Sequence, residues 1–516
     1  MISWAVHRSE LLASFFVKWT SDPPNLSRTQ NERFGFRKFI IIVTKDGKAA
    51  AIDPSENGRV QWTTRIPSLK ATLSHDEVHI SIQGDIVAIR FKNYYTVFLD
   101  VNSGANIDST SGENWQIQEH LHKASEWPVS VLTHDGSSNG EFLELPLGDR
   151  SLIVSKTSNG HLVARPSSLG KKKALAWEFA PPARETIVSF AHRPAHDPVA
   201  SIGKVLGDRN VLYKYLNPNI LLVTCQDGQT QRVSFVLLDA STGEILHSAG
   251  RSSVNLKQPI SSALSGNILA YSLYSSGSEK SFPNEPQVPS GFQLSVSELY
   301  ESPYPNDRRV SATTHISSSP KGNVSRHQVP DLPYVYTQSF LPSEPIAQPV
   351  FITTLQGITP RSLLCSLPQS NSIVSIPRYL LDPRRPSGRE PNVSEIEEGL
   401  LRYNAVLEFS PTWYLSHQRE TYSLAKIITS PSLLESTSLV FAFGDFDLFG
   451  TRVSPIGGFD LLGKGFSKIQ LVATVSALAI GTAILSPLVS PYNTIPLSML
   501  SCAQIRRKQV DGTWKI

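Results

Sequence analysis

The stretch Lys38–Ile66, KFIIIVTKDGKAAAIDPSENGRVQWTTRI, decides the fold class of this chain. Phe39–Val43 is a β-branched apolar run, and the Asp46-Gly47 pair that follows it is a strong signal for a tight hairpin turn. Lys48–Ile52 then returns as a second strand, and after a further turn Val60–Thr64 forms a third. The stretch therefore predicts a small antiparallel sheet.

Parts of this unit recur along residues 36–300. NYYTVFLDVNSGANIDS contains a strand, then Asp100 and Gly104, and RVSFVLLDASTGEILHSA contains a strand, then Asp239 and Gly243. SNGHLVARPSSLGKKKALAWEF keeps its glycines and a tryptophan but lacks the aspartate. The aspartate can close the turn through its side chain, and the glycine supplies the position with φ > 0. Four or five such units predict the blades of a β-propeller, which we favour over an irregular β-sandwich.

The composition describes a folded protein of more than one domain. The chain has 516 residues, of which 40% are hydrophobic and 18% charged, and its net charge of +4 is dispersed. That charge does not favour a nucleic-acid partner, and Lys171–Lys173 is interpreted as a solvated loop. Three cysteines give no disulfide framework, so Cys225 and Cys365 are expected to be free, with one bridge between them as the alternative.

An apolar stretch stands near the C-terminus. KIQLVATVSALAIGTAILSPLV, residues 468–489, has no charged side chain after its first residue. As a helix it would be about 31 Å long from Ile469 to Val489, the thickness of a bilayer's hydrocarbon core. The sequence predicts a transmembrane helix here, and the alternative is a buried core helix. The small residues expected to pack against partner helices are Ala473, Ser476, Ala477, Ala479 and Gly481.

The remaining segments complete the predicted organisation. Residues 1–35 have no clear assignment and make a poor signal peptide, and 36–376 form the propeller region, with flexible Ser/Pro-rich insertions around one strand at 275–333. Residues 377–467 hold helices and strands, with helices expected at 394–409 and 413–429, the first capped by Ser394 and Glu397. Residues 490–516 form a short tail.

Three tripeptides fit the N-glycosylation acceptor pattern. They begin at Asn25, Asn323 and Asn392, all ahead of the predicted membrane helix. If the body of the chain lies in the lumen, all three are candidates for modification.

Searches for catalytic and metal-binding motifs give no assigned site. His192 and His196 have the spacing of a zinc pair, but Pro194 between them disfavours a regular helix. Gly458–Gly465, GFDLLGKG, resembles a phosphate-binding loop, yet the hydroxyl residue that would bind magnesium is replaced by Gly465. We predict no catalytic residue, cofactor or metal.

From residue 334 to 489 the sequence closely resembles the C-terminal region of the family of subunit 1 of the ER membrane protein complex. The resemblance rests on YVYTQSFLPSEPIAQPVFITTLQGITPRSLLCSLPQSNSIVSIPRYLLDPRRP, RYNAVLEFSPTWYLSHQRE, IITSPSLLESTSLVFAFGDFDLFGTRVSP and FDLLGKGFSKIQL, which follow one another in family order. The family signature in the first run comprises Leu381, Asp382, Pro383, Arg384, Arg385 and Pro386. The family is longer on its N-terminal side and begins with a signal peptide, so the resemblance implies an N-terminally incomplete form.

The resemblance implies a function and a topology. It implies a non-catalytic scaffold subunit whose mainly β body is a lumenal β-propeller of quinoprotein-like blades, followed by a short helical segment and one C-terminal transmembrane helix. It further implies a single-pass type I protein of the endoplasmic reticulum membrane with a cytosolic tail. It also implies other subunits of the complex, client membrane proteins and lipid as partners, and insertion of tail-anchored and multipass proteins as the supported activity. The alternatives are a membrane-anchored quinoprotein-like dehydrogenase and a type I lumenal cargo receptor.

Overall fold

The structure of the chain is a computed structural model. It divides into two compact units, residues 1–458 and 459–516, which are described separately. The residues described are 35, 38–43, 48–53, 59–65, 78–83, 86–91, 96–107, 142–147, 150–157, 159–166, 175–194, 197–277, 289–307, 332–417, 419–444, 447–460 and 468–489.

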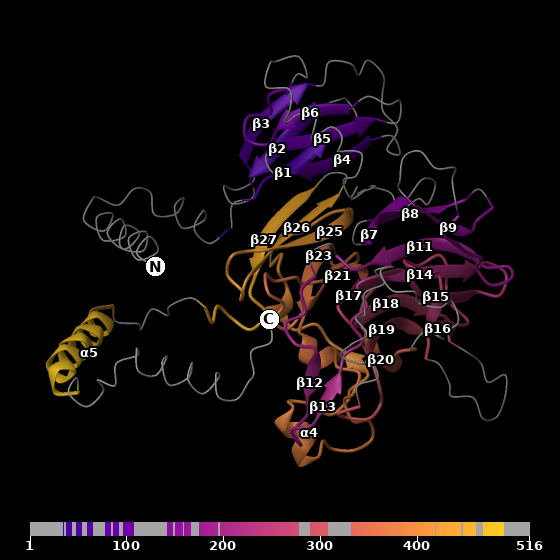
Figure 1. The fold of residues 1–516 in the computed structure, drawn as a ribbon. Coiled ribbons are helices and arrows are strands. Elements are labelled where there is room, and N and C mark those ends of the chain that lie inside the picture. The colour runs from indigo at the N-terminus through magenta and orange to yellow at the C-terminus, as the bar shows by residue number, and fades with distance from the viewer. Residues whose placement is uncertain are drawn as a thin grey trace, which may run out of the picture. The chain divides into compact units, whose positions relative to one another are not determined.

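The first unit is built almost entirely of antiparallel sheets that follow one another along the chain (Figure 1). The first sheet holds β1 (Ile40–Val43), β2 (Lys48–Asp53) and β3 (Arg59–Arg65), and the second holds β4 (Val78–Gln83), β5 (Ile86–Phe91) and β6 (Thr96–Asp100). The third holds β7 (Phe142–Leu147), β8 (Arg150–Lys156), β9 (Leu162–Pro166) and β10 (Trp177–Phe179). The fourth holds β11 (Thr186–His192), β14 (Ile220–Asp227), β15 (Arg232–Asp239) and β16 (Ile245–Arg251).

The later sheets vary this plan. The fifth holds β17 (Ser261–Ser265), β18 (Ile268–Ser275), β19 (Gly291–Tyr300) and β20 (Tyr334–Pro342), with β24 (Val406–Leu407) added in parallel to β20. The sixth holds β21 (Ala347–Phe351), β22 (Leu363–Leu367) and β23 (Ser372–Ile376). The seventh holds β25 (Leu424–Pro431), β26 (Ser438–Gly444) and β27 (Leu448–Val453). A two-stranded ribbon, β12 (Gly203–Val205) and β13 (Val211–Tyr213), lies in the connection between β11 and β14 of the fourth sheet.

The predicted first sheet is confirmed. Ile40 pairs with Ile52 and Val43 with Ala49, so the two predicted strands are antiparallel neighbours, while the turn at Asp46-Gly47 lies outside the described residues. The described residues hold seven sheets of three or more strands, whereas the sequence revealed only four or five units. The sixth sheet lies within the predicted propeller region 36–376, whereas the seventh lies beyond it, in residues that the family resemblance also covers.

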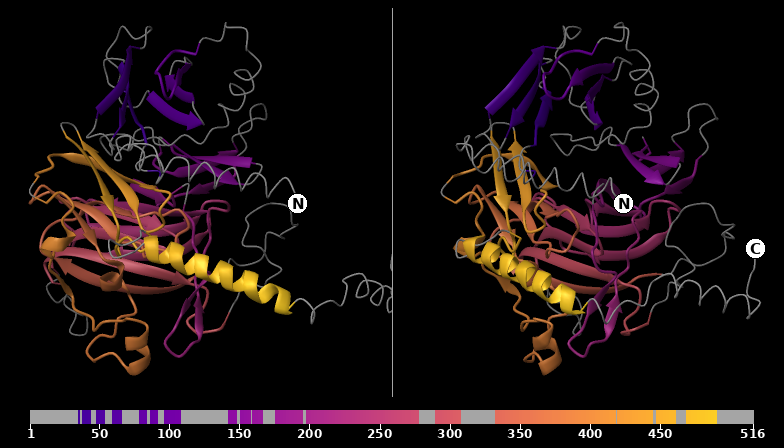
Figure 2. Two further views of the ribbon diagram at one scale, coloured as in Figure 1. Left: turned by 90° about the vertical axis from the view of Figure 1, so that its left-hand side faces the viewer. Right: turned by 60° about the vertical axis from the view of Figure 1, so that its left-hand side comes forward.

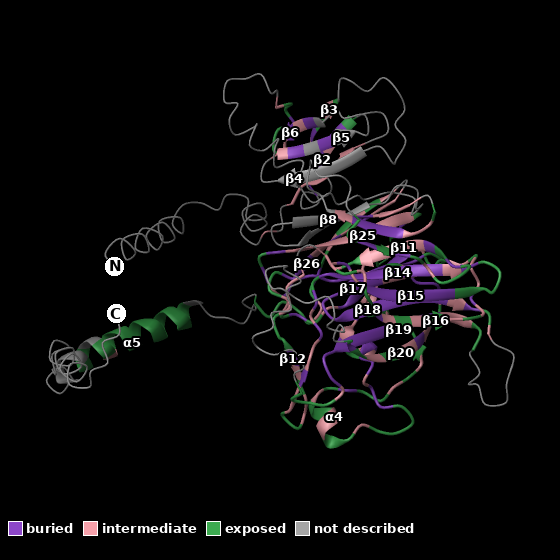
Figure 3. Ribbon diagram, turned by 45° about the vertical axis from the view of Figure 1, so that its right-hand side comes forward, coloured by how far each residue is buried: buried purple, intermediate pink, exposed green. Residues whose placement is uncertain are grey.

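Neighbouring sheets share apolar cores, which explains why the central strands are apolar on both faces. In the fourth sheet, β14 and β15 are buried along most of their length, as are β18 and β19 of the fifth (Figure 3). Shared clusters join the first sheet to the second, the third to the fourth, and each later sheet to the next. A sheet with a neighbour on each face needs this continuous apolar pattern rather than strict alternation.

Two of these joints use the predicted turn in the same way. Asp239 Oδ1 accepts from the Ser241 backbone NH at 2.8 Å, and the Gly243 NH donates to the Asp239 carbonyl at 2.7 Å. Trp177 of the preceding sheet lies on this turn and donates through Nε1 to the Ala240 carbonyl at 2.7 Å. Gly243 has φ +79°, and a Cβ there would lie 2.8 Å from the indole.

The joint between the first and second sheets repeats this geometry. Trp62 donates through Nε1 to the Val101 carbonyl at 2.7 Å, and Asp100 closes the turn through its side chain. Gly104 has φ +67°, and a Cβ there would lie 2.4 Å from Trp62. The sequence correctly predicts the roles of aspartate and glycine, and the structure adds that a tryptophan of the preceding sheet completes the turn.

Two carboxylates tie loops of later sheets together. Asp197, after β11, accepts from the Gly266 NH at 2.6 Å and pairs with Arg361 in the connection between β21 and β22. Glu435, between β25 and β26, accepts from Thr354 Oγ1 and the Ile358 NH, each at 2.7 Å. Although burial alone would raise it, the pKa of each carboxyl is lowered, by Arg361 and Arg193 for Asp197 and by hydrogen bonds for Glu435.

The two helices predicted in residues 377–467 are not found as predicted: the first is much shorter, and the second is replaced by other structure. Instead of a helix over 394–409, α4 covers only Val393–Glu397, and Gly399 at φ +78° follows it. Its capping box joins Asn392 and Glu395, not Ser394 and Glu397. The expected helix at 413–429 is replaced by the 3₁₀ turn η4 (Pro411–Trp413) and by β25, whose Ile427 and Ile428 pair with β26.

In the second unit, α5 runs from Lys468 to Val489 as one uninterrupted helix (Figure 2). Apolar side chains on it are exposed, Ile469 by 83% and Leu478 by 70%. Among the residues that the structure describes, no helix combines the length and the apolar character needed to cross a membrane. The side chains of α5 are described at residues 469–482, 484 and 485.

Candidate functional site

The signature Leu381–Pro386 forms the end of a short 3₁₀ turn and the bend that follows it. The turn η3 (Arg378–Leu381) begins after Pro377, whose backbone is extended. Asp382 then closes the bend, because its Oδ1 accepts from the Arg384 backbone NH at 3.0 Å. Pro383 and Pro386 have no NH and do not continue a helix, so the chain turns back toward the fifth sheet.

Asp382 is the centre of a buried ion network. Its Oδ2 pairs with Lys204 Nζ from β12, and its Oδ1 lies 3.6 Å from Arg384 Nε. Although burial alone would raise the pKa of the Asp382 carboxyl, the charges of Lys204, Arg378 and Arg384 hold it well below its usual range. Asp382 is therefore ionised across the physiological pH range.

The two signature arginines have different roles. Arg384 donates through Nη2 to Glu398 Oε2 at 2.7 Å. Arg385 is buried and donates to backbone carbonyls of Leu380 at 2.6 Å, Leu401 at 3.3 Å and Arg402. A single guanidinium thus holds both ends of the loop that carries α4, because its planar fork presents several donors at fixed angles.

Further bonds join the signature loop to the fifth sheet. Arg378 donates through Nη2 to Glu298 of β19, and the Tyr300 hydroxyl donates to the same carboxylate. Gln338 of β20 donates through Nε2 to the Arg385 carbonyl at 2.6 Å. The signature therefore connects the fifth sheet, the ribbon β12–β13 and the α4 loop.

The charges of the network are matched with one another. Each cation of the network contacts a carboxylate or a set of backbone carbonyls, and each carboxylate contacts at least one cation. The cations are Lys204, Arg378, Arg384 and Arg385, and the carboxylates are Asp382, Glu298 and Glu398. A small cavity of about 490 Å³ lies beside the network and is lined by Leu206, Tyr336, Pro383, Arg384 and Arg389 among others. What this arrangement does chemically is to hold three segments in one geometry.

The candidate glycosylation sites are only partly within the described residues. Asn392 is exposed at the N-cap of α4, where its Oδ1 accepts from the Glu395 NH at 2.8 Å and its backbone NH donates to the Glu395 carboxylate. Asn25 and Asn323 lie outside the described residues. The small residues of α5 are exposed, except for half-buried Gly481.

The cysteines and histidines form no shared site in the part of the chain that is described. Cys225 and Cys365 are free and buried in the fourth and sixth sheets, as expected, and burial raises the pKa of Cys225 to about 12. No group of three or more His, Cys, Asp or Glu side chains among the described residues could hold a metal ion. His196, Lys171–Lys173 and residues 461–465 lie outside that part.

The sequence located the signature but missed its partners. Lys204, Glu298 and Glu398 complete the network, yet Lys204 is 178 residues from Asp382. No local pattern marks these residues, because their importance depends on the tertiary fold. The one available signal was the unusual density of arginine and proline in the signature itself.

Comparison with known proteins identifies relatives of most of the chain. A family model described as "ER membrane protein complex subunit 1, second beta-propeller" matches residues 35–455. Proteins named ER membrane protein complex subunit 1 are 33% identical over 313 residues in Xenopus laevis and 26% identical over 482 residues in Saccharomyces cerevisiae. These matches cover 60% of this chain and 29% of the frog protein, and 89% of this chain and 60% of the yeast protein. The chain thus spans less than two thirds of either relative.

Solved structures show only distant likenesses. BamB from Moraxella catarrhalis has 12% sequence identity and a TM-score of 0.28, with 79% of each chain covered. Hydrazine synthase from Kuenenia stuttgartiensis has 9% identity and a TM-score of 0.36, with 82% of this chain and 96% of the other covered. At these TM-scores the likenesses carry no weight for this chain.

Proposed function

The chain belongs to the family of ER membrane protein complex subunit 1, and from this premise we propose that it is a non-catalytic scaffold subunit of that complex. In this role it supports the insertion of tail-anchored and multipass proteins into the endoplasmic reticulum membrane. Its partners are the other subunits, client membrane proteins and the lipid bilayer. The premise comes from the match over residues 35–455, within a chain that spans 29% of the frog relative.

The observation that carries this proposal is the use made of the family signature. Its charged side chains form ion pairs with one another and with Lys204, and they donate hydrogen bonds to backbone carbonyls. A catalytic acid or base needs a substrate within reach of a group whose proton can move at working pH. The Asp382 carboxylate, held ionised by three cations, is suited to holding structure instead.

A proposed topology completes the assignment. We propose that α5 anchors the chain in the membrane as a single-pass type I protein, with the sheets in the lumen and residues 490–516 in the cytosol. The exposed apolar side chains of α5 support this, since in water such surface would be costly. Its small residues from Ala473 to Gly481 are proposed to pack against partner helices.

Purification tests the scaffold assignment directly. The full chain, tagged at its C-terminus and purified in mild detergent, is expected to bring with it a stoichiometric set of membrane subunits. A variant with Arg385→Ala should lose that set, because the loop carbonyls lose their shared donor. Arg389→Ala is the matched control, since Arg389 is exposed and, among the described carboxylates, forms an ion pair with Glu395 alone. A monomer that oxidises alcohols or sugars with added quinone would contradict the proposal.

A further inference from the structure

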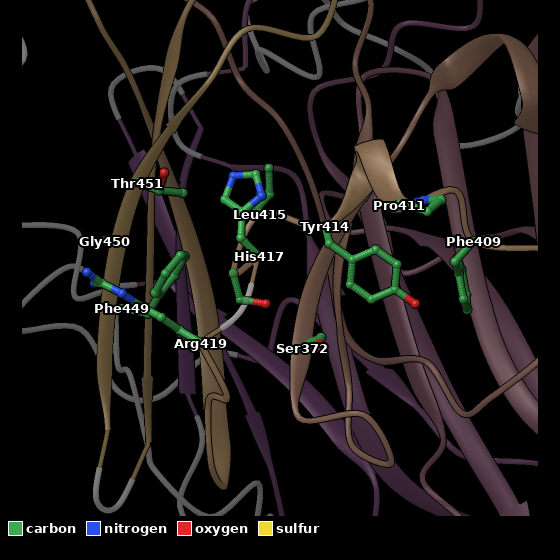
Figure 4. A pocket seen from close by; sticks show the side chains of 11 residues that line it. Ser372, Phe409, Pro411, Tyr414, Leu415, His417, Arg419, Phe449, Gly450 and Thr451 are labelled. Atoms are coloured by element: carbon green, nitrogen blue, oxygen red, sulfur yellow. The ribbon is translucent and has the colours of Figure 1, made fainter.

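A groove of about 980 Å³ runs between the sixth and seventh sheets. Phe449, Gly450 and Thr451 of β27 form one wall (Figure 4). The remaining lining residues are Ser372, Phe409, Pro411, Tyr414, Leu415, Ser416, His417 and Arg419. Figure 4 shows these β27 residues on one strand, with Tyr414 and Phe409 across from them. The groove is not part of the signature network, which uses none of these residues.

The position of the groove is explained by a sheet that stops at three strands. The third and fourth sheets have four strands each, and the outer strand β20 of the fifth is covered by β24. The outer strand β23 of the sixth is covered by the chain itself, because Val374 bridges to Tyr414 and the Leu415 NH donates to the Ile373 carbonyl at 2.8 Å. Among the described residues, β27 pairs with β26 alone.

An outer strand that pairs on one side only, as β27 does among the described strands, is a template for another strand. Its outward-facing NH and carbonyl groups are strong hydrogen-bonding groups, and an extended peptide can satisfy them by adding to the sheet. Three consecutive β27 residues line the groove. Because successive residues of a strand face opposite sides of its sheet, a groove that contacts all three runs along the strand's edge, where a fourth strand would add. The groove therefore fits an extended peptide better than a compact ligand.

The lining gives the chemistry of that peptide. Phe409, Tyr414 and Phe449 offer aromatic surface on both walls. Arg419 also lines the groove and is exposed, and among the described residues its side chain has no carboxylate partner. An apolar side chain against the aromatic walls and a carboxylate on the guanidinium would satisfy both features.

We propose that an extended segment of another polypeptide adds to β27 as the fourth strand of the seventh sheet. It places an apolar side chain between Phe409 and Phe449 and a carboxylate against Arg419. The inference rests on the proposed function for the identity of this polypeptide, which we assign to another subunit of the same complex.

Amide hydrogen exchange, read by mass spectrometry, tests this proposal. The full chain is compared within the purified complex and after separation from its partners in the same detergent. Peptides covering Leu448–Val453 should exchange at least about tenfold more slowly in the complex, because an added strand protects edge amides. Peptides covering β16, the outer strand of the four-stranded fourth sheet, should be unchanged.

Equal exchange of Leu448–Val453 in the two samples, with the partners present, would overturn the inference and leave the proposed function intact. Equal and strong protection in the separated chain would also overturn it, since the strand would then come from the chain itself. A chain that never has partners would overturn both proposals.

A charge reversal supplies a second test. Arg419→Glu should reduce the protection of Leu448–Val453 in the complex by at least about threefold while leaving the unfolding temperature unchanged, because it repels the partner's carboxylate. Lys257→Glu is the control, since Lys257 is exposed and its substitution changes the net charge by the same amount. Full protection of Leu448–Val453 in the Arg419→Glu complex would contradict the proposed contact between Arg419 and a carboxylate of the partner.

Discussion

Lys204 Nζ and Asp382 Oδ2 form an ion pair between residues 178 positions apart, joining the ribbon β12–β13 to the family signature. The side chains are 26% and 8% exposed, so most of their hydration is lost on folding. Such a pair adds little net stability compared with apolar residues, but breaking it leaves a buried charge without compensation. The pair therefore fixes how the two segments meet.

The first prediction concerns this pair. Lys204→Met should lower the free energy of unfolding by about 3–5 kcal/mol, since Asp382 loses its closest cation. The double variant Lys204→Met with Asp382→Leu should lose less than the sum of the two single variants. Thermal or denaturant unfolding of the four proteins gives this cycle, with Lys257→Met as a surface control. Additive losses would show that the pair does not couple the segments.

The second prediction compares three glycines. Gly243→Ala should destabilise most, by about 2–4 kcal/mol, because it adds left-handed strain to overpacking against Trp177. Gly388→Ala should cost about 1–2 kcal/mol, since Gly388 has φ +73° but open space around it. Gly228→Ala should be close to neutral, because neither condition applies. An equal loss at Gly243 and Gly388, measured by denaturant unfolding, would mean that the indole contact adds nothing.

These turns show which part of the fold could be predicted from sequence. The Asp239 and Gly243 pattern is local, and its side-chain and φ requirements follow from the residue types. The partner Trp177 lies 63 residues from Ala240 in the sequence, so only the folded chain brings it to the turn. Repetition predicted the blades, but nothing local predicted which tryptophan would reach which turn.

The errors in residues 377–467 have physical causes. The capping pattern at Ser394 competes with an equally good one at Asn392, and Gly399 at φ +78° stops the helix soon after. Further on, Ile427 and Ile428 form a strand because β26 is there to pair with them. Likewise the signature could be found from its sequence, whereas Lys204 could not.

The third prediction concerns pH. Burial, followed by the charges of Arg361, Lys204 and Arg378, lowers the pKa of Lys214 to about 8. Between pH 8 and the ordinary lysine value of about 10.5 the unfolded chain binds more protons than the folded one, so this residue makes stability rise with pH in that window. Below pH 8 the full cost of the buried charge is present.

Lys214→Met should therefore stabilise the protein at pH 7, and its advantage over the unsubstituted chain should shrink between pH 8 and 10. Unfolding temperatures of both proteins across this range measure the difference. Lys257→Met should show a constant offset. A constant offset for Lys214→Met as well would place the lysine in an ordinary aqueous environment.

The fourth prediction uses the cap of α4 to test lumenal placement. We expect a glycan on Asn392, which is exposed and begins an acceptor tripeptide. Asn392→Asp should remove one glycosidase-sensitive shift in gel mobility while keeping the helix cap, because aspartate caps as well as asparagine. Ser394→Ala should lose the same mobility shift, because it removes the hydroxyl that the acceptor tripeptide requires. Identical mobility of all three proteins, before and after glycosidase, would contradict glycosylation at this position.

The fifth prediction concerns α5 as an anchor. The full chain should remain in the membrane fraction after alkaline carbonate treatment, because the exposed apolar side chains of α5 favour lipid over water. A chain that ends at Phe466, and so lacks α5, should be released. Replacing Leu478 and Ile480 with lysine should have the same effect as truncation, since two charges near the centre of a span are costly. Release of the unaltered chain by carbonate would contradict the anchor.

A second pair of substitutions separates anchoring from helix packing. Replacing Ala473 and Ala477 with leucine should keep the chain in the carbonate-resistant membrane fraction, because leucine is as compatible with lipid as alanine. The same variant should co-purify less well with its partners, because the bulkier side chains fill the small-residue face that lets helices approach closely. Unchanged co-purification of the leucine variant would place the helix contacts on another face of α5.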